Sequence, residues 1–300
     1  MQHLSLFNHP NYSGLNVEGE QRYWRHDVLR AGRVVGALAG VVNGPHFLSG
    51  FSAPFGGFEI MRNRENPALI HDVVAEATAA LATTGTRHWQ VRAKPMAYST
   101  NEPGIHLALN RTGWRVARAD LSYHIDLRLY PAASHYVDDL RSDARRHLKR
   151  ALACDLRLRH TTSPRAERAA YDLLLENRAA AGRQLKLPFD YISTLSARFP
   201  KRLRYFTLLH GVEPVAAALV YQVRTHLPLL IYWGHRPGSE QMAPMNGLAY
   251  HLVDRFIKEG AAILDLGTAS EYGTPIESLA SFKRSVLGEP TLRIDYEREA

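Results

Sequence analysis

Residues 228–267 read PLLIYWGHRPGSEQMAPMNGLAYHLVDRFIKEGAAILDLG, and this stretch carries the strongest indication of the architecture. Its first seven residues form an apolar run typical of a buried strand. A polar segment with Gly and Pro follows, and then Leu248, Leu252 and Phe256 recur at the spacing of one helix face. Gly260 ends that helix, and a second short apolar strand closes the stretch. The order of strand, loop, helix and strand predicts mixed α/β structure.

The same order of elements is predicted earlier in the chain. Short strand-like runs lead through a segment with Pro and paired Gly to a helix over 66–83, and a strand over 88–93 follows. Tyr130 precedes a proline, which disfavours helical backbone and marks a boundary. We therefore expect an α/β fold of two similar domains, 1–130 and 131–300, each a mixed central sheet flanked by helices.

The second half is predicted to hold helices around an antiparallel meander. Ser163 is a good N-cap, and Pro164 suits the first helical position. The expected elements are helices over 134–153, 164–181, 190–198, 245–259 and 276–285 and strands over 203–209, 215–223, 228–234, 262–267 and 292–294.

Composition restricts the class of protein. The 300 residues are 45% apolar and 22% charged, which is globular composition. The single cysteine, Cys154, excludes a disulfide framework and a cysteine-rich zinc site, and we interpret it as buried filler. No uninterrupted apolar run reaches the roughly 18 residues of a membrane span. The first residues show no basic region followed by an apolar run, so we expect a cytoplasmic protein.

The positive charge is concentrated in one segment. The net charge is +8, and residues 141–210 hold 16 Lys and Arg against 6 Asp and Glu. A local basic block indicates an anionic partner such as tRNA, a nucleotide, a diphosphate or a membrane surface. A solvated, arginine-rich helix face is the alternative explanation.

Familiar catalytic motifs are missing from the sequence. It contains no GxSxG, HExxH, P-loop lysine or GxGxxG pattern, and its histidines show no metal-ligand spacing. We therefore expect no metal site and no tightly bound cofactor. The remaining candidate is the loop before the helix at 245–259, because a helix N-terminus offers free N–H groups to a phosphate or an oxyanion. An ordinary strand–helix connection explains this loop equally well.

This loop resembles the one in GNAT acyltransferases. There the pattern Gln/Arg-x-x-Gly-x-Gly/Ala holds the pyrophosphate of acyl-CoA. Here the corresponding residues are Gln241, Pro244, Asn246 and Gly247. Pro244 replaces the first glycine of the pattern and removes a backbone donor. The resemblance thus implies a GNAT-like fold with an altered loop for CoA.

A further resemblance is to the Fem-type peptidyltransferases, which have tandem GNAT-like domains and move an aminoacyl group from tRNA to an amine. Four features carry it in the same order as in that family, and together they cover about residues 30–295. They are Pro54-Phe55-Gly56-Gly57-Phe58; Gly113-Trp114 with Tyr123-His124-Ile125-Asp126-Leu127; Arg145-Arg146-His147-Leu148-Lys149-Arg150-Ala151; and Leu264-Asp265-Leu266-Gly267 with Leu279-Ala280-Ser281-Phe282-Lys283.

This resemblance implies residue roles. Lys283 is expected near the acyl carbonyl or the 3′-terminal phosphate of the donor, where a fixed cation would stabilise the transition state; a surface lysine is the alternative. Tyr232 and Trp233 alternate across their strand, so one is expected to face the substrate. Asp265 is expected to be a structural hydrogen-bond acceptor rather than a base. The expected catalytic residues are Lys283 and Tyr232, the expected substrate-binding residues are Phe282, Trp233, Arg146, Arg150, Gly56 and Gly57, and the expected donor-binding residues are Gln241, Asn246 and Gly247.

The leading hypothesis is an acyltransferase that forms an amide bond by direct transfer. The donor would be aminoacyl-tRNA, and the acceptor a small-molecule or peptide amine. An acyl-CoA-dependent GNAT N-acyltransferase is the alternative, and tRNA would then not be a partner. A non-catalytic RNA- or membrane-surface-binding protein on the same fold is a third hypothesis.

Overall fold

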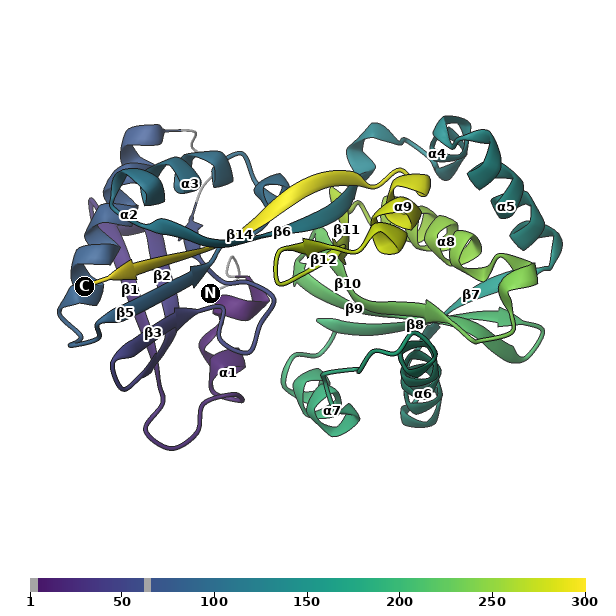
Figure 1. Ribbon diagram of the computed structural model, residues 1–300, viewed down its shortest axis with the longest axis horizontal. Coiled ribbons are helices and arrows are strands. Elements are labelled where there is room, and N and C mark those ends of the chain that lie inside the picture. Colours follow the sequence, from purple (N-terminus) through teal and green to yellow (C-terminus); the bar gives the residue numbers. More distant parts are fainter. Residues whose placement is uncertain (1–4, 62–65) are drawn as a thin grey trace. The chain divides into compact units, whose positions relative to one another are not determined.

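The structure is a computed structural model that describes residues 5–61 and 66–300, and the chain divides into two compact units (Figure 1). Unit 1 comprises Met1–Ser122, Thr268–Ile276 and Pro290–Ala300, and unit 2 comprises Tyr123–Gly267 and Glu277–Glu289. The sequence showed no secretory pattern in its first residues. Of that N-terminal segment, residues 1–4 lie outside the described residues.

Unit 1 is built on a mixed sheet. Its strands follow the order β1-β2-β3-β5-β14, and β4 pairs with β2. Strand β6 begins in this unit and ends in unit 2. The elements are η1 (Leu6–Asn8), α1 (Pro10–Ser13), β1 (Arg22–Arg30), β2 (Arg33–Asn43), β3 (His46–Ser49), β4 (Phe58–Ile60), α2 (Pro67–Ala82), β5 (His88–Arg92), η2 (Met96–Tyr98), α3 (Glu102–Arg111), β6 (Arg115–Asp126), β12 (Ser270–Glu271), β13 (Thr274–Pro275) and β14 (Glu289–Glu299).

Helix α2 confirms the helix predicted over 66–83. The Asn66 side chain caps it by accepting from the N–H groups of Ala68 and Leu69, at 3.1 and 3.2 Å. Its apolar residues at helical spacing are buried in the unit 1 core with Trp114. The capping residue and the buried face both match the sequence pattern, which is why this helix could be predicted from the sequence.

The last strand lies in a different unit from the one expected. The division at residue 130 assigned the strand at 292–294 to the second domain. Instead β14 is longer and pairs antiparallel with β5, with Asp295 opposite Arg92. The Arg118 guanidinium donates to the buried Asp295 carboxylate at 2.5 Å and adds a charged contact inside unit 1. The C-terminal segment thus returns to complete the first sheet.

The backbone N–H groups of Gly56 and Gly57, in the loop before β4, both donate hydrogen bonds within unit 1. The Gly56 N–H donates to the Arg92 carbonyl and the Gly57 N–H to the Ser49 hydroxyl, both at 2.8 Å. Both glycines are buried, and Gly57 has a φ of +77°. Their amides are therefore engaged within unit 1. The expected substrate contact of Gly56 and Gly57 finds no support in this geometry, which gives them a packing role.

A buried histidine makes the stability of unit 1 depend on pH. The His106 ring nitrogen Nδ1 lies 2.8 Å from the Tyr296 hydroxyl, and burial lowers the pKa of His106 to about 4. An unfolded histidine has a pKa near 6.5. Between these two values the unfolded chain binds the proton that the folded chain excludes, so stability is full above about pH 6.5 and is lost as the pH falls towards 4.

We expect this residue alone to remove about 3 kcal/mol of unfolding free energy between pH 7 and pH 4. Urea unfolding followed by circular dichroism at several pH values measures it. His106→Gln keeps a hydrogen-bonding side chain but cannot titrate, so its stability should fall less steeply below pH 6.5. Parallel pH profiles for the two proteins would contradict the assignment.

Unit 2 contains the strands β11-β10-β9-β8-β7, in that order in the sheet. Helices α6 and α7 cover one face of it, and α5, α8 and α9 lie on the other (Figure 1). The elements are η3 (Leu127–Leu129), α4 (Ala133–Asp139), α5 (Ser142–Ala153), β7 (Leu156–Thr161), α6 (Pro164–Ala180), α7 (Phe189–Arg198), β8 (Leu203–His210), β9 (Glu213–Arg224), β10 (Leu227–His235), η4 (Glu240–Met242), α8 (Pro244–Lys258), β11 (Ile263–Thr268) and α9 (Glu277–Ser285).

The helix predicted over 134–153 is two helices. The chain leaves helical geometry at Leu140, which has a φ of −63° and a ψ of 138°. The Arg145 guanidinium donates to the carbonyls of Asp138 and Leu140 and satisfies groups that the break exposes. Both Tyr136 in α4 and Leu140 at the break are buried. The meander over β8, β9 and β10 is as predicted.

Within residues 5–61 and 66–300, no helix has the length and apolar character needed to span a membrane.

Candidate functional site

Strands β10 and β11 part near their C-terminal ends. They run parallel and, among the described residues, pair only at Leu229 and Asp265. The register of β10 against β9 shifts between Leu230 and Tyr232, which is a β-bulge. Beyond this bulge the β10 side chains change from buried to half-buried. Beyond the bulge β10 therefore continues to pair with β9 as far as His235, whereas its pairing with β11 at Leu229 lies near its start.

A buried lysine is fixed at the end of β11. Asp265 accepts a 2.7 Å hydrogen bond from the Gly267 N–H, and Gly267 has a φ of +76°. The Gly267 carbonyl in turn accepts a 2.8 Å hydrogen bond from the Lys283 ammonium. Only 3% of Lys283 is exposed, so the cation belongs to the interior of unit 2 rather than to its surface. Asp265 has the structural role that we expected.

Gly267 belongs to the motif that ends at Lys283, but the sequence assigned it no role. A Cβ at this position would lie 3.2 Å from the Leu230 carbonyl oxygen and 3.9 Å from the Lys283 ammonium. Its left-handed backbone also favours glycine. The glycine therefore lets the end of β11 lie close to the Leu230 carbonyl of β10 and to the Lys283 ammonium. Its position two residues after an aspartate, at the end of an apolar strand, was the available signal.

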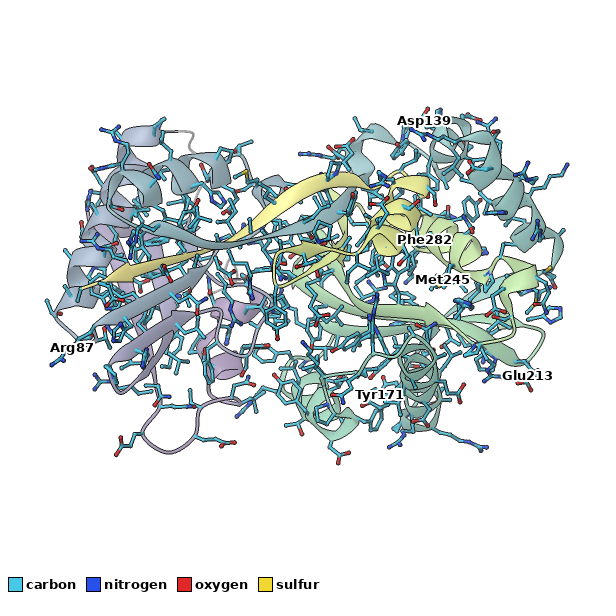
Figure 2. The ribbon with its side chains drawn as sticks, in the orientation of Figure 1. Arg87, Asp139, Tyr171, Glu213, Met245 and Phe282 are labelled. Atoms are coloured by element: carbon cyan, nitrogen blue, oxygen red, sulfur yellow. The ribbon has the colours of Figure 1, made fainter. Side chains whose placement is uncertain are left out.

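Phe282, the residue before Lys283 on α9, meets an aromatic side chain of β10. The Trp233 and Phe282 rings lie 5.4 Å apart between centroids, at 55°. Both are half-buried, and Figure 2 labels Phe282 on α9. The structure thus brings together Trp233 and Phe282 as an aromatic pair that joins β10 to α9. This is the wall against which a ring or an acyl chain could pack.

Tyr232 lies on the other face of the sheet, with α6. Its hydroxyl accepts a 3.2 Å hydrogen bond from the Lys186 N–H, and the Arg178 guanidinium lies 5.2 Å from its ring centroid. Burial raises the pKa of Tyr232, so the phenol stays neutral at physiological pH. The alternation predicted for Tyr232 and Trp233 is confirmed. The expected catalytic role of Tyr232 stays a prediction, since its hydroxyl is engaged here with the Lys186 amide.

We expect Tyr232→Phe to lower turnover by less than about 3-fold and to cost about 1 kcal/mol of stability, because it removes one acceptor from the Lys186 amide. Turnover and thermal unfolding of the variant measure both effects. A loss of turnover near 100-fold with unchanged stability would restore Tyr232 to the catalytic group.

The loop before α8 satisfies much of its own hydrogen-bonding capacity. The Glu240 carboxylate accepts from the Gly238 N–H at 3.1 Å, and its pKa is lowered by its own backbone N–H and by that of Gly238. Pro244 has no N–H, and the Asn246 and Gly247 amides donate to the Ala243 carbonyl. The start of α8 therefore offers few free donors, and a fixed carboxylate faces the loop before it.

Gly247 packs against protein rather than facing solvent. A Cβ there would lie 3.1 Å from the Ala151 side chain and 3.4 Å from Leu156 and Leu208. It lets α8 approach α5 and the sheet closely. The expected donor contact through Gly247 is therefore not supported by its surroundings. Asn246 is half-buried and Gln241 is exposed, at the start of α8 and in η4.

Arg146 and Arg150 occupy the exposed side of α5. Ala144, Leu148 and Ala151 form its buried side. The two arginines thus stand on one accessible helix face but away from the β10 and β11 contacts described above. Their binding to an anionic substrate stays a prediction.

The comparisons with known proteins agree with this architecture. Residues 138–284 match the family model described as an acetyltransferase (GNAT) domain. The structure of FemX superposes with a TM-score of 0.70 at 10% identity, over 93% of this chain and 88% of that one. The sequence matches no curated protein.

Two further structures are similar. One is the C-terminal domain of an Agrobacterium fabrum protein described as a lysylphosphatidylglycerol synthetase, with a TM-score of 0.58 at 13% identity over 92% of this chain and 84% of that one. Another is a tandem GNAT protein from the clavulanic acid pathway, with a TM-score of 0.51 at 17% identity over 93% and 83%. The chain therefore resembles FemX and the tandem GNAT-like acyltransferases in fold, as the sequence motifs predicted.

Proposed function

We propose that this chain is an acyltransferase that forms an amide bond, moving an aminoacyl group from aminoacyl-tRNA to an amine acceptor. The observation that carries the proposal is the buried Lys283 ammonium, held by the Gly267 carbonyl where β10 and β11 part. A desolvated, fixed cation stabilises developing negative charge far better than an exposed one.

In the proposed step, the amine attacks the ester carbonyl that joins the amino acid to the terminal ribose. The new C–N bond forms, and the C–O bond to the ribose breaks. The proton of the amine ends on the departing ribose oxygen. Lys283 would stabilise the oxyanion of the tetrahedral intermediate, while Trp233 and Phe282 would pack against the donor or acceptor. The chain would supply alignment and charge rather than a covalent intermediate.

The choice of donor rests on the loop before α8. A pyrophosphate needs several free N–H groups at a helix start. Here Pro244 lacks an N–H, the Asn246 and Gly247 amides donate to the Ala243 carbonyl, and the Glu240 carboxylate adds a negative charge to the loop. The basic block at 141–210 supports a polyanionic donor instead. The likeness to FemX and to a protein described as a lysylphosphatidylglycerol synthetase is consistent with aminoacyl transfer.

An acyl-CoA-dependent N-acyltransferase is the second candidate. The match of residues 138–284 to an acetyltransferase (GNAT) domain model favours it. In that case the altered loop at Pro244 would still hold a pyrophosphate, with Gln241 and Asn246 as its side-chain contacts.

A single-turnover transfer assay tests the proposal. Bulk tRNA charged with labelled amino acids is mixed with excess protein and a pool of amines and peptides, and mass spectrometry identifies amide products. We expect an amide product that forms faster than uncatalysed hydrolysis of the charged tRNA. Transfer from acetyl-CoA but never from charged tRNA would contradict the proposal.

A further inference from the structure

Unit 2 has a basic groove at the sheet edge opposite to Lys283. Two hollows, of about 670 and 350 Å³, open along β7, β8 and the C-terminal part of α8 and share His160 and Arg255. Together we call them the edge groove, and its cations are Arg157, Lys201, Arg202, Arg204, Arg255 and Lys258.

The edge groove has an excess of positive charge. Its six Lys and Arg side chains face three carboxylates, those of Glu167, Asp254 and Glu259. Arg255 and Lys258 stand in the last turn of α8, whose dipole on its own would repel an anion. The positive charges of these side chains therefore oppose the negative end of the helix dipole.

Part of this charge is rigidly held. The Arg204 fork donates to both Glu259 carboxylate oxygens, at 2.6 and 2.7 Å, and lies 4.8 Å from the Phe206 ring centroid. These contacts hold the pKa of Glu259 below its usual value. Arg202 donates to the Gln222 and Val223 carbonyls. Fixed guanidinium groups suit phosphate recognition, because little side-chain freedom is lost on binding.

Other side chains in the groove are exposed and available. Lys201 is exposed and stands in a turn with a φ of +71°. Arg157 and Lys258 project to solvent from β7 and α8. Arg157 pairs with Asp155, which precedes β7, and Lys258 pairs with Asp254 on α8. The His160 ring lies 5.2 Å from the Phe206 ring and adds a flat surface on which a base could stack.

The position of the groove restricts its ligand. Four strand spacings separate β7 from β11, which is about 19 Å across the sheet. A molecule that places its acyl group at Lys283 and its phosphates in the edge groove must span that distance. The volume of the hollows also exceeds the needs of one phosphate and falls in the range of pockets for larger ligands. These features favour a nucleic acid backbone over a small anion.

We propose that the edge groove binds the phosphate backbone of the donor tRNA, away from its aminoacylated end. This rests on the proposed function, since it assigns the part of the protein that holds the body of the donor. Phosphate contacts position a nucleic acid without reading its sequence. The groove would therefore accept several charged tRNAs, and selection of the amino acid would belong to the site around Lys283.

The test removes exposed charges and leaves the Arg204 and Glu259 pair intact. One variant combines Arg157→Gln, Lys201→Gln and Lys258→Gln. The control combines Arg87→Gln, Arg111→Gln and Arg115→Gln, which removes the same charge from exposed positions of unit 1. Binding of bulk tRNA is measured by fluorescence anisotropy between about 50 and 200 mM salt, the range over which phosphate contacts weaken most clearly.

We expect the groove variant to lose at least about 10-fold in affinity at low salt and to show a salt slope shallower by about 2, since each lost phosphate contact removes 0.7 to 0.9. The control should stay within about 2-fold of the unmodified protein, because its charges lie outside the groove. If the unmodified protein binds tRNA and the groove variant shows the same affinity and salt slope, the proposed role of the edge groove is refuted, but the proposed function is not. Equal losses in both variants would also refute that role of the groove. No tRNA binding by the unmodified protein would overturn the groove and the proposed function together.

Discussion

Replacing Lys283 by methionine is expected to lower turnover about 10²–10³-fold, the effect of removing one preorganised oxyanion-stabilising group. Methionine keeps most of the buried volume but loses the ammonium that donates to the Gly267 carbonyl. The fold should survive, at a cost of about 1–3 kcal/mol for the carbonyl left without its donor. Single-turnover rates and thermal unfolding of the same preparation measure both effects.

Arg284→Met is the matched control for this substitution. Arg284 follows Lys283 on α9 but is exposed, and its guanidinium pairs with Glu277 on the surface. We expect its turnover to stay within about 3-fold of the unmodified protein, because exposed ion pairs contribute little. A folded Lys283→Met protein with full activity would refute the role of Lys283. Equal losses in both variants would place the effect in α9 as a whole.

The second large effect is expected on stability, at Gly56. A Cβ there would lie 2.5 Å from the Gly50 nitrogen and 2.9 Å from both the Gly50 Cα and the Ser49 hydroxyl. Two of these atoms belong to the backbone, and the Gly56 N–H is already fixed on Arg92. The backbone of the loop cannot move away without breaking these contacts. We therefore expect Gly56→Ala to lower the free energy of unfolding by about 3 kcal/mol.

That loss corresponds to a fall in Tm of about 6–12 °C for a unit of this size. Gly85→Ala is the control, because Gly85 has a φ of +78° but an added Cβ meets no atom within 4 Å. Gly85→Ala should lower the free energy of unfolding by only about 1 kcal/mol. A Gly56→Ala protein with unchanged Tm and a raised KM would instead support the substrate contact that the sequence motif implied.

Elements with a local signal were predictable. Helix α6 begins where Ser163 and Pro164 predicted, and the Ser163 hydroxyl accepts from the Ala166 N–H. Strand β7 and most of β14 were not predicted, although apolar and polar residues alternate along both strands. In β14, Leu292, Ile294 and Tyr296 recur at period 2, but the charged residues between them hide the pattern.

Helix α3 was missed for a different reason. Pro103 and Gly104 near its start resemble a turn in sequence. In the structure, a Cβ at Gly104 would lie 2.9 Å from the Ile70 side chain, so this glycine allows α3 to approach α2. A close contact between two helices depends on distant residues, and no local pattern reports it.

The candidate site was predictable only in part. Lys283 came from a motif, whereas its burial depends on the long-range bond to Gly267. Gly56, Gly57 and Gly247 were matched to functional glycines by spacing alone. Spacing does not distinguish a glycine that admits a ligand from one that admits another strand or helix. The edge groove likewise gathers residues from β7, β8 and α8 that are distant in sequence.

The central claim is that the donor is carried by tRNA, and a binding titration tests it most directly. The purified chain is titrated with bulk tRNA and with acetyl-CoA at about 50 and 200 mM salt, because phosphate contacts weaken steeply over this range. We predict tight binding of tRNA that weakens strongly at the higher salt, and no saturable binding of acetyl-CoA. Saturable acetyl-CoA binding at both salt concentrations, without tRNA binding, would contradict the account and make acyl-CoA the donor.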